Sequence, residues 1–394
     1  MAFRCTSQYF AGGLLFQRLA TNPPATYGGG MQKSDGMNYA PESKNKPKPV
    51  VEPGEFRFAA MALDHGHIYG QSNGLTEAGG EVVAVWDPDP AKVEAYREKF
   101  PSAKAAASKE EILEDDSIQL VAAAAVPNLR GPLGCEVMKH GKDYFTDKTP
   151  FTTMEQLDEA KRVVSETGKK YGVYFSERLH VESAVYAGQL IEQGAIGDIV
   201  QVLGLGPHRL SKANRPDWFF NKEQYGGIIT DIGSHHFEQF LAYSGATDAE
   251  VLHARVANYA NPDKPELEDF GEASLLANNG VANYIRVDWF TPDGSTTWGD
   301  GRLFVIGTKG VIEARKYMDV ATEYGPDQLY LTDADGEKRI DCQGVVGFPF
   351  FGAFILDCLN RTEKAMTQDH AFKAAELCLK AQAIADAGGL RPSE

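Results

Sequence analysis

Two short segments of the chain carry side chains suited to acid–base chemistry on an alcohol. In the first, Asp231 follows the glycine pair Gly226-Gly227, and His235 comes four residues after it. If Asp231 opens a helix, this spacing places its carboxylate and the imidazole on one face. A carboxylate that orients an imidazole is suited to taking a proton from an alcohol near neutral pH. Because Asp is also a common helix N-cap, the pair alone does not establish catalysis.

The second segment is Asp147-Lys148, at the end of an apparent nucleotide-binding region. The residues before it predict a buried strand over 143–146. Lys148 therefore stands at the carboxyl end of a strand, where α/β proteins bind their ligands. A lysine at a strand end can also be an ordinary surface residue, but this position favours a functional role.

Composition limits the partners that the chain can have. At 394 residues it exceeds the usual size of a single core, so two domains are expected. The formal net charge of −16 argues against nucleic acid or an anionic membrane, because either partner needs a basic face. Five scattered cysteines without a Cys-x-x-Cys pair are typical of a reduced compartment, and no apolar run approaches the ~18 residues of a membrane span. We therefore expect a cytoplasmic protein with no nucleic acid, membrane or metal partner.

The pattern along the chain divides it into three regions. Residues 1–54 include a stretch rich in Pro, Gly, Lys and Asn, which we interpret as a mobile tail or as an arm that packs on a neighbouring subunit. Residues 55–176 alternate apolar strands with helices, which predicts an α/β Rossmann domain with a parallel, doubly wound sheet. Residues 177–394 contain several β-rich segments and two final helices, about 349–360 and 370–388. They predict an α+β domain with an open, mostly antiparallel sheet covered by helices on one side.

The turn after the first expected strand is where a dinucleotide pyrophosphate would meet a helix N-terminus. This turn retains only Gly66 and Gly70 of the glycine fingerprint. A metal held by Asp64, His65 and His67 is an alternative, since all three residue types can bind metals. Side chains this close together on a tight turn converge with difficulty, so we favour the dinucleotide.

Asp87 ends the second expected strand, over 81–86. An acidic residue about twenty positions after the turn can hydrogen-bond the adenine ribose hydroxyls and repel a 2′-phosphate. This position favours NAD over NADP as the cofactor. The alternative is that Asp87 only initiates a turn with Pro88.

Together these features resemble the glucose–fructose oxidoreductase/inositol dehydrogenase (Gfo/Idh/MocA) family, from about residue 56 to residue 389. Asp147-Lys148 stands where that family has Glu-Lys-Pro, and Asp231 to His235 matches its Asp-x-Gly-x-His motif. The resemblance implies a Rossmann domain followed by a sheet domain, and NAD(P)-dependent oxidation or reduction of sugars, inositols and related polyols. It also implies that Lys148 is the catalytic lysine, with Asp231 and His235 completing the set. Thr149 replaces the family's proline, and we expect this replacement to remove a cis peptide at the lysine.

The expected reaction is hydride transfer from a secondary alcohol to the nicotinamide with loss of the hydroxyl proton. His235, held in one tautomer by Asp231, is the expected base, and Lys148 would stabilise the developing alkoxide. The residues expected to hold the cofactor are Asp64, His65, Gly66, His67, Ile68, Asp87, Pro127, Asn128, Asp147 and Lys148. The residues expected to contact the substrate are Glu177, Arg178, His180, His208, Arg209, Trp218 and His236, although each could instead face solvent or pack in the core.

Three functions stay open from the sequence. The first is an NAD-dependent dehydrogenase of a sugar or cyclitol hydroxyl, and the second is a glycoside hydrolase or lyase that uses NAD for transient oxidation. The third is a non-catalytic sugar-binding protein, because Asp64 replaces a glycine in the phosphate turn. The segment 295–302, with Trp298, could reach the cleft or form a surface hairpin. An open sheet leaves an apolar face, so we expect a homodimer or homotetramer.

Overall fold

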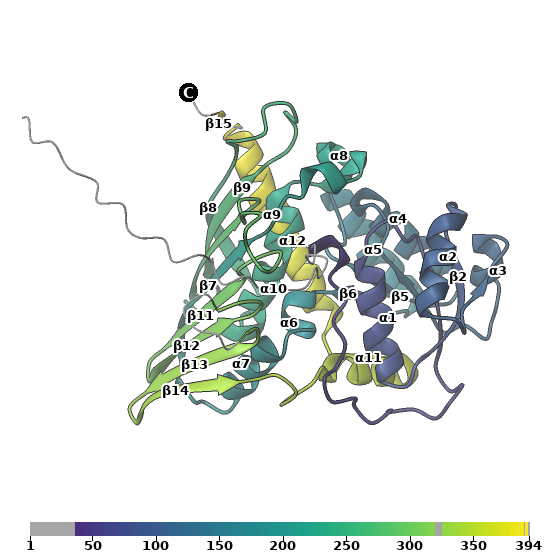
Figure 1. Ribbon diagram of the computed structural model, residues 1–394, viewed down its shortest axis with the longest axis horizontal. Helices are drawn as coiled ribbons and strands as arrows, with labels where there is room; N and C mark the ends of the chain where they lie inside the picture. Colours follow the sequence, from purple (N-terminus) through teal and green to yellow (C-terminus); the bar gives the residue numbers. More distant parts are fainter. Residues whose placement is uncertain (1–35, 320–324, 390, 393–394) are drawn as a thin grey trace, which may run out of the picture. The chain divides into compact units, whose positions relative to one another are not determined.

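The structure is a computed structural model that describes residues 36–319 and 325–389 and the backbone of residues 391–392. Two sheets organise these residues (Figure 1). The first sheet has six parallel strands in the order β3-β2-β1-β4-β5-β6, which is the doubly wound order expected from the sequence. Its strands are β1 (Arg57–Met61), β2 (Glu81–Trp86), β3 (Lys104–Ala105), β4 (Leu120–Ala123), β5 (Asp143–Asp147) and β6 (Tyr171–Tyr174).

Helices cover both faces of this sheet. Those that alternate with the strands are α1 (His67–Glu77), α2 (Pro90–Lys99), α3 (Lys109–Leu113), α4 (Pro127–Lys139) and α5 (Met154–Thr167). Side chains of β5 alternate between the two faces, as in any strand. On one face, Tyr144 lies against α4, where a Cβ at Gly134 would come within 2.6 Å of its ring. On the other face, Phe145 packs on Phe350 and Phe354 of a helix from the far end of the chain.

That helix is α11 (Pro349–Asn360), and it returns to the first sheet beside α1 (Figure 1). Phe351 lies so close to Gly74 of α1 that a Cβ there would be 2.3 Å from its ring. Burying each such ring stabilises the fold by about 2 kcal/mol. Residues late in the sequence therefore complete the first layer, and the domain boundary after residue 176 stays a prediction.

The second sheet has nine strands in the order β14-β13-β12-β11-β7-β10-β9-β8-β15. Two pairs, β7 with β10 and β8 with β15, are parallel and the others are antiparallel, which confirms the expected mostly antiparallel sheet. Its strands are β7 (Ile199–Pro207), β8 (Ala249–Asn258), β9 (Phe270–Ala277), β10 (Ala282–Asp288), β11 (Arg302–Gly307), β12 (Gly310–Arg315), β13 (Gln328–Asp333), β14 (Gly336–Asp341) and β15 (Arg391–Pro392).

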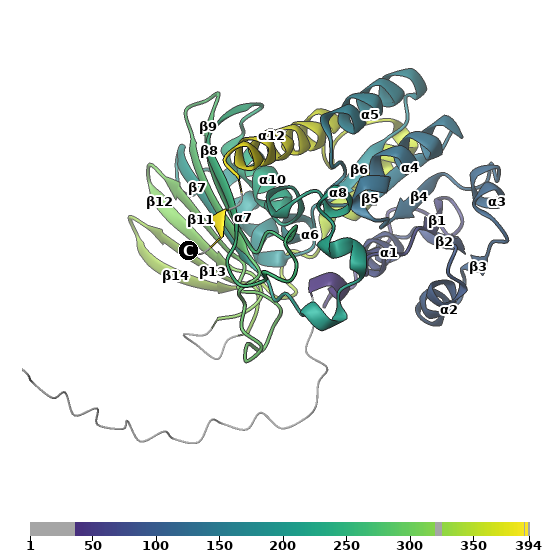
Figure 2. The ribbon, with the colours of Figure 1, turned by 90° about the horizontal axis from the view of Figure 1, so that it is seen from above.

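Helices lie against one face of the second sheet (Figures 1 and 2). The main ones are α10 (Gly233–Ser244), which packs on β7, and α12 (Gln368–Ala387), which packs on β8 and α10. Thr367 caps α12, because its side chain accepts a hydrogen bond from the backbone N–H of His370. The shorter helices of this region are α6 (Ser176–Leu179), α7 (Glu182–Glu192), α8 (Lys222–Tyr225) and α9 (Ile228–Asp231), with 3₁₀ turns η2 (Lys212–Asn214) and η3 (Asp217–Phe220).

The segment before the first strand packs against the chain itself. Residues 36–54 begin with the 3₁₀ turn η1 (Gly36–Asn38) and pass along α1, where Ser43 contacts Glu77. The sequence predicts a tail or an arm on a neighbouring subunit for residues 1–54, of which residues 1–35 lie outside the described part. No helix among the described residues is both long and apolar enough to cross a membrane.

Three of the elements that differ from the sequence-based expectation are α4, β13 and β14. The sequence predicts a helix over 133–140, whereas helix α4 already begins at Pro127 and has Pro132 inside it. Proline cannot donate to the carbonyl of Asn128, and Gln156 supplies that hydrogen bond instead, at 2.9 Å. Strands β13 and β14 were not expected, although the dipeptide Asp335-Gly336 between them is a hairpin signal.

Candidate active site

Lys148 and Asp231 meet where the first sheet faces the helices of the second. Lys148 follows β5 directly, and its Nζ donates to Oδ1 of Asp231 at 2.5 Å. The side chains are 6% and 14% exposed, so the ion pair is largely shielded from water. The two motifs that the sequence singled out therefore come together in space.

Asp231 does not open a helix, which corrects the expectation from its spacing. It is the last residue of the four-residue helix α9, and α10 starts two residues later at Gly233. Among the described residues the carboxylate of Asp231 accepts a hydrogen bond from Lys148, and His235 Nδ1 has no partner. The structure therefore does not show Asp231 fixing the tautomer of His235.

His235 lies in the first turn of α10 and is only 2% exposed. Burial lowers its pKa well below the usual value, with Lys148 and His67 acting in the same direction and Glu177 opposing them. The imidazole is therefore neutral at neutral pH. A neutral imidazole with a free ring nitrogen can accept a proton.

The loop after Lys148 is held by a buried arginine that sequence reasoning missed. Arg130, from α4, donates to the carbonyl oxygens of Lys148 and Thr149, and its Nη2 lies 3.1 Å from Asp147 Oδ2. The Lys148–Thr149 peptide is cis, so the replacement of the family's proline by Thr149 does not remove the cis bond, contrary to expectation. Five donors in one guanidinium suit this role, because several carbonyls and a carboxylate need partners in a dry site.

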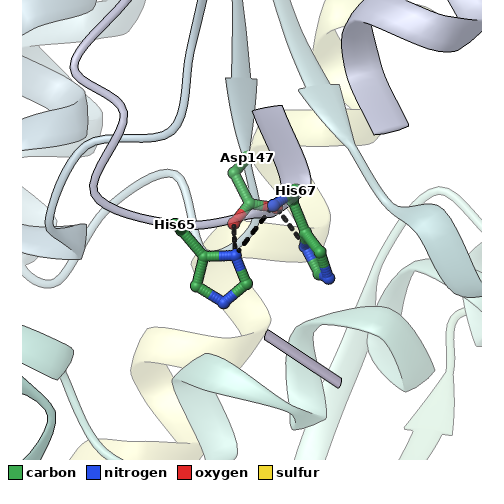
Figure 3. Close-up of side chains that lie close together, drawn as sticks. All are labelled: His65, His67 and Asp147. Carbon is green, nitrogen blue, oxygen red and sulfur yellow. Dashed lines mark hydrogen bonds and ion pairs between the residues drawn. The ribbon is translucent and has the colours of Figure 1, made fainter. Parts of the chain in front are cut away.

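Asp147 gathers the two histidines of the phosphate turn (Figure 3). Its Oδ1 lies 2.9 Å from His67 Nδ1, and its Oδ2 lies 3.4 Å from His65 Nδ1. Burial alone would raise the pKa of Asp147, but His67, Arg130 and His65 hold that pKa below its usual value. The carboxylate is therefore ionised and can accept a hydrogen bond from Nδ1 of His67, whereas Nδ1 of His65 accepts from the backbone N–H of His67 at 3.2 Å.

These three residues also have the side-chain types of a metal site, and their ligand atoms lie within 4.8 Å of one another. The histidines therefore do converge, although with Asp147 and not with Asp64 as the sequence-based alternative had it. The guanidinium of Arg130 contacts the same carboxylate and would repel a cation. This arrangement favours a hydrogen-bonded cluster beneath the turn over a metal centre.

Asp87 and Asp64, which were expected to help hold the cofactor, already make hydrogen bonds or ion pairs with other residues of the protein. The carboxylate of Asp87, at the end of β2, accepts from the backbone N–H groups of Leu63 at 2.6 Å and Asp89 at 2.9 Å. Asp64 pairs with Lys92 at 2.6 Å, and this lysine offsets the negative charge that replaces a glycine.

Glu177 is the centre of a second buried polar cluster. Its Oε2 accepts from Nζ of Lys316 at 2.8 Å, and the same Nζ donates to Gln239 at 2.8 Å. Its Oε1 is buried without a hydrogen-bond partner, and Nε2 of His208 lies 3.9 Å away. Burial would raise the pKa of Glu177, but Lys316 and the nearby histidines hold it well below its usual value. Lys316, at the end of β12, carried no sequence signal that would have placed it here.

The remaining expected substrate residues mostly contact protein. Arg178 pairs with Glu238, and His180 Nδ1 lies 2.6 Å from the Tyr174 hydroxyl. Arg209 donates to the carbonyls of Ser295 and Thr297, and so holds the segment 295–302. The ring of His236 lies on β7, where a Cβ at Gly204 or Gly206 would be 2.3 Å from a ring nitrogen. Trp218, in η3, contacts Phe219.

Trp298 does not lie on a surface hairpin. It is 3% exposed, and its ring packs on His208 at 4.5 Å and on Tyr317 at 4.3 Å between centroids. Its Nε1 is buried without a partner. Nε1 of Trp298 is thus an unpaired donor, and Oε1 of Glu177 is an unpaired acceptor. Such groups next to aromatic rings suit a ligand that carries hydroxyl groups.

The first sheet fits a dinucleotide in its main features. Gly66 and Ile68 lie at the N-terminus of α1, and Gly66 has no side chain that would keep a phosphate away from its backbone. Pro127 and Asn128 start α4, and Oδ1 of Asn128 is buried without a partner. These residues, with Asp87, could hold NAD at the carboxyl ends of the strands, although residues 37 and 38 lie against Gly66.

Comparison with known proteins identifies the class. The sequence model described as an oxidoreductase family with an NAD-binding Rossmann fold matches residues 59–175, and the Gfo/Idh/MocA C-terminal domain model matches residues 185–313. The chain is therefore an oxidoreductase with an NAD-binding Rossmann domain. It belongs to the Gfo/Idh/MocA family, which confirms the resemblance stated from the sequence.

Three relatives illustrate the range of that family. A protein from Erwinia carotovora atroseptica, described only as an oxidoreductase, is 47% identical with a TM-score of 0.82, over 86% of this chain and 100% of its own. A scyllo-inositol 2-dehydrogenase (NAD(+)) from Bacillus subtilis is 26% identical over 66% of this chain and 73% of that protein. A D-xylose dehydrogenase from Paenarthrobacter nicotinovorans is 27% identical over 37% of this chain and only 38% of that protein.

Proposed function

We propose that this chain is an NAD-dependent oxidoreductase that oxidises or reduces a secondary hydroxyl of a sugar, a sugar derivative or a cyclitol. The observation that carries the proposal is the Lys148–Asp231 ion pair at the carboxyl end of β5, together with the neutral, buried imidazole of His235, whose pKa Lys148 helps to lower. A fixed cation and a neutral base are the two groups that alcohol oxidation requires from a protein.

NAD, when bound, supplies the hydride acceptor. Lys148 donates a hydrogen bond to the reacting oxygen and favours its negative charge, and Asp231 keeps the ammonium group in place. His235 takes the hydroxyl proton on its ring, and the burial that lowers its pKa also lets it release that proton readily. Exclusion of water strengthens both the interaction of Lys148 with the reacting oxygen and its ion pair with Asp231.

The substrate class rests on the second cluster and on the relatives. The free Oε1 of Glu177 can accept from a substrate hydroxyl, and Nε1 of Trp298 can donate to one when Tyr39 leaves the ring of Trp298 against which it packs. Relatives named for xylose and scyllo-inositol support a polyhydroxylated substrate. The four cysteines that the structure describes are buried and free, which supports a reducing compartment such as the cytoplasm.

A screen of aldoses, cyclitols and aryl glycosides with NAD tests the proposal. We expect NADH to accumulate with at least one sugar or cyclitol and not in the Lys148→Ala variant. Release of aglycone without net NADH would instead establish the redox-neutral cleavage reaction. Binding of a sugar with neither product, in protein shown to bind NAD, would contradict both enzymatic functions.

A further inference from the structure

The N-terminal segment crosses the turn that should receive the dinucleotide phosphates. We define the strap as residues 36–43, which run from η1 along α1. A Cβ at Gly66 would lie 2.5 Å from the carbonyl oxygen of Met37 and 2.6 Å from Oδ1 of Asn38. The strap therefore lies in the space that is left because Gly66 has no side chain.

Gly66 occupies the second glycine position of the dinucleotide fingerprint. At that position the missing side chain lets the backbone approach the pyrophosphate. In this structure two strap oxygens, from Met37 and Asn38, occupy the same approach. Because both are hydrogen-bond acceptors, they would repel phosphate oxygens as well as exclude them sterically.

Specific contacts hold the strap in this position. Nε2 of His67 lies 3.0 Å from the Gly36 carbonyl oxygen, and Nδ2 of Asn73 donates to the carbonyls of Ala40 at 3.4 Å and Pro41 at 3.2 Å. Farther along, the backbone N–H of Ser43 donates to Oε1 of Glu77 at 3.0 Å. Each contact comes from α1, so the strap is tied to the helix whose N-terminus it covers.

Tyr39 anchors the strap on the other side of the site. Its ring packs on Trp298 and Tyr317, each at 5.5 Å between centroids. A Cβ at Gly36 would lie 3.1 Å from Trp298 and 3.3 Å from the ring of His208. The strap thus lies against both the cofactor turn and the aromatic wall of the substrate site.

We propose that the strap closes the dinucleotide turn in the cofactor-free protein, and that NAD binds only after residues 36–39 leave Gly66. The apparent affinity for NAD is then the intrinsic affinity reduced by the fraction of molecules with an open strap. The binding rate levels off at high NAD concentration, because opening precedes binding.

The test uses the full chain with Tyr39→Ala, which removes the aromatic anchor and leaves the turn unchanged. For a strap that is open in roughly one molecule in ten, the variant binds NAD up to about tenfold more tightly. Amide hydrogen exchange of residues 36–43 rises in the variant without NAD, and rises in the unaltered protein when NAD is added. Asn73→Ala, which loosens the strap from α1, changes both measurements in the same direction.

Tyr259→Ala is the matched control, because Tyr259 is an aromatic residue that follows β8, outside the strap and the turn. We expect it to change neither NAD affinity nor exchange of residues 36–43. Binding of NAD with undiminished protection of the strap, or equal affinity in Tyr39→Ala and the unaltered protein, overturns this proposal and leaves the proposed function intact. Failure of every variant to bind NAD overturns both.

Discussion

Nζ of Lys148, at the end of β5, donates to Oδ1 of Asp231, at the end of α9, over 2.5 Å. The two residues lie eighty-three positions apart in the chain. One comes from the parallel sheet and the other from a helix beside the second sheet, so the candidate site exists only where these layers meet. The contact fixes the lysine for the role that we propose for it.

Lys148→Ala is expected to lower kcat by orders of magnitude while NAD affinity changes only a few-fold, because the lysine acts on the reacting oxygen and does not hold the adenosine half. Asp231→Asn is expected to do less damage, since the amide can still accept from Nζ. The measurements are steady-state kcat and an NAD titration. Lys139→Ala, at an exposed lysine of α4, is the control and should match the unaltered enzyme. An equal loss in the control would show that the effect is not specific.

His235→Ala is expected to reduce turnover strongly, with partial recovery at high pH, where hydroxide or an ionised substrate replaces the base. Since burial lowers the pKa of His235, the acid limb of the kcat profile in the unaltered enzyme should lie below pH ~6.5, the ordinary value for histidine. A pH–rate profile checks both statements. Near-normal turnover of His235→Ala at all pH values would place the base elsewhere, with His180 and Glu177 as the next candidates.

The unaltered enzyme should prefer NAD to NADP. Asp87 directly follows β2, and its carboxylate would repel the 2′-phosphate of NADP. Asp87→Asn removes the charge but keeps an oxygen that can accept from the Leu63 N–H, so the preference should narrow without loss of the turn. The ratio of kcat/KM for the two cofactors measures this effect. Asp89→Asn, at the N-cap of α2, is the control. Equal use of both cofactors by the unaltered enzyme would falsify the role of Asp87.

The protein should lose stability as pH falls below about 6.5. Burial lowers the pKa of His208 to about 4 and of His180 and His236 to about 3. As the pH falls, these histidines take up protons in the unfolded chain before they do so in the folded protein. The free energy of unfolding is therefore unaffected above the pKa of the unfolded chain, and it decreases until the pH reaches the pKa of the folded protein. The total loss for these three imidazoles by pH ~4 should be on the order of 10 kcal/mol, because each contributes about 1.4 kcal/mol per pH unit.

Urea unfolding at neutral pH and at pH ~5 measures the slope of the free energy of unfolding against pH. In this range the imidazoles of the unfolded chain take up protons and the buried ones do not. His180→Gln should flatten this slope, because glutamine keeps an acceptor for the Tyr174 hydroxyl but does not titrate. His253→Gln should leave the slope unchanged, since the side chain of His253 is 57% exposed. An identical slope for His180→Gln would assign the acid loss to other groups.

The open face of the second sheet should pair with another subunit. Phe304, Leu203 and Tyr284 lie side by side on neighbouring strands of this face, and Leu276 and Val311 on the same face are 41% and 38% exposed. Figure 1 shows the helices on the opposite side. We expect a homodimer or homotetramer by sedimentation at micromolar concentration, and dissociation in Leu203→Asp. A monomeric unaltered protein would exclude this assembly.

Periodicity was enough to predict the first sheet except for its two-residue edge strand β3. Strands such as β4 are continuous apolar runs because a parallel sheet buries both faces, and helices such as α5 are amphipathic with a capping residue at Thr153. The mostly antiparallel character of the second sheet was also readable, but β14 was not. Its side chains are mostly exposed and polar, so hydrophobic alternation, the main signal for a strand, is missing there.

For the site, the sequence by itself determined which residues could do chemistry and that Lys148 stands at a strand end. It did not determine their partners. The pairing of Asp231 with Lys148, of Glu177 with Lys316, and of Arg130 with the loop after Lys148 depends on packing between distant segments. Local patterns report only on a residue's own helix or strand, whereas these contacts form when the two sheets and their helices come together. The tertiary structure alone therefore decided that the strap lies on the cofactor turn.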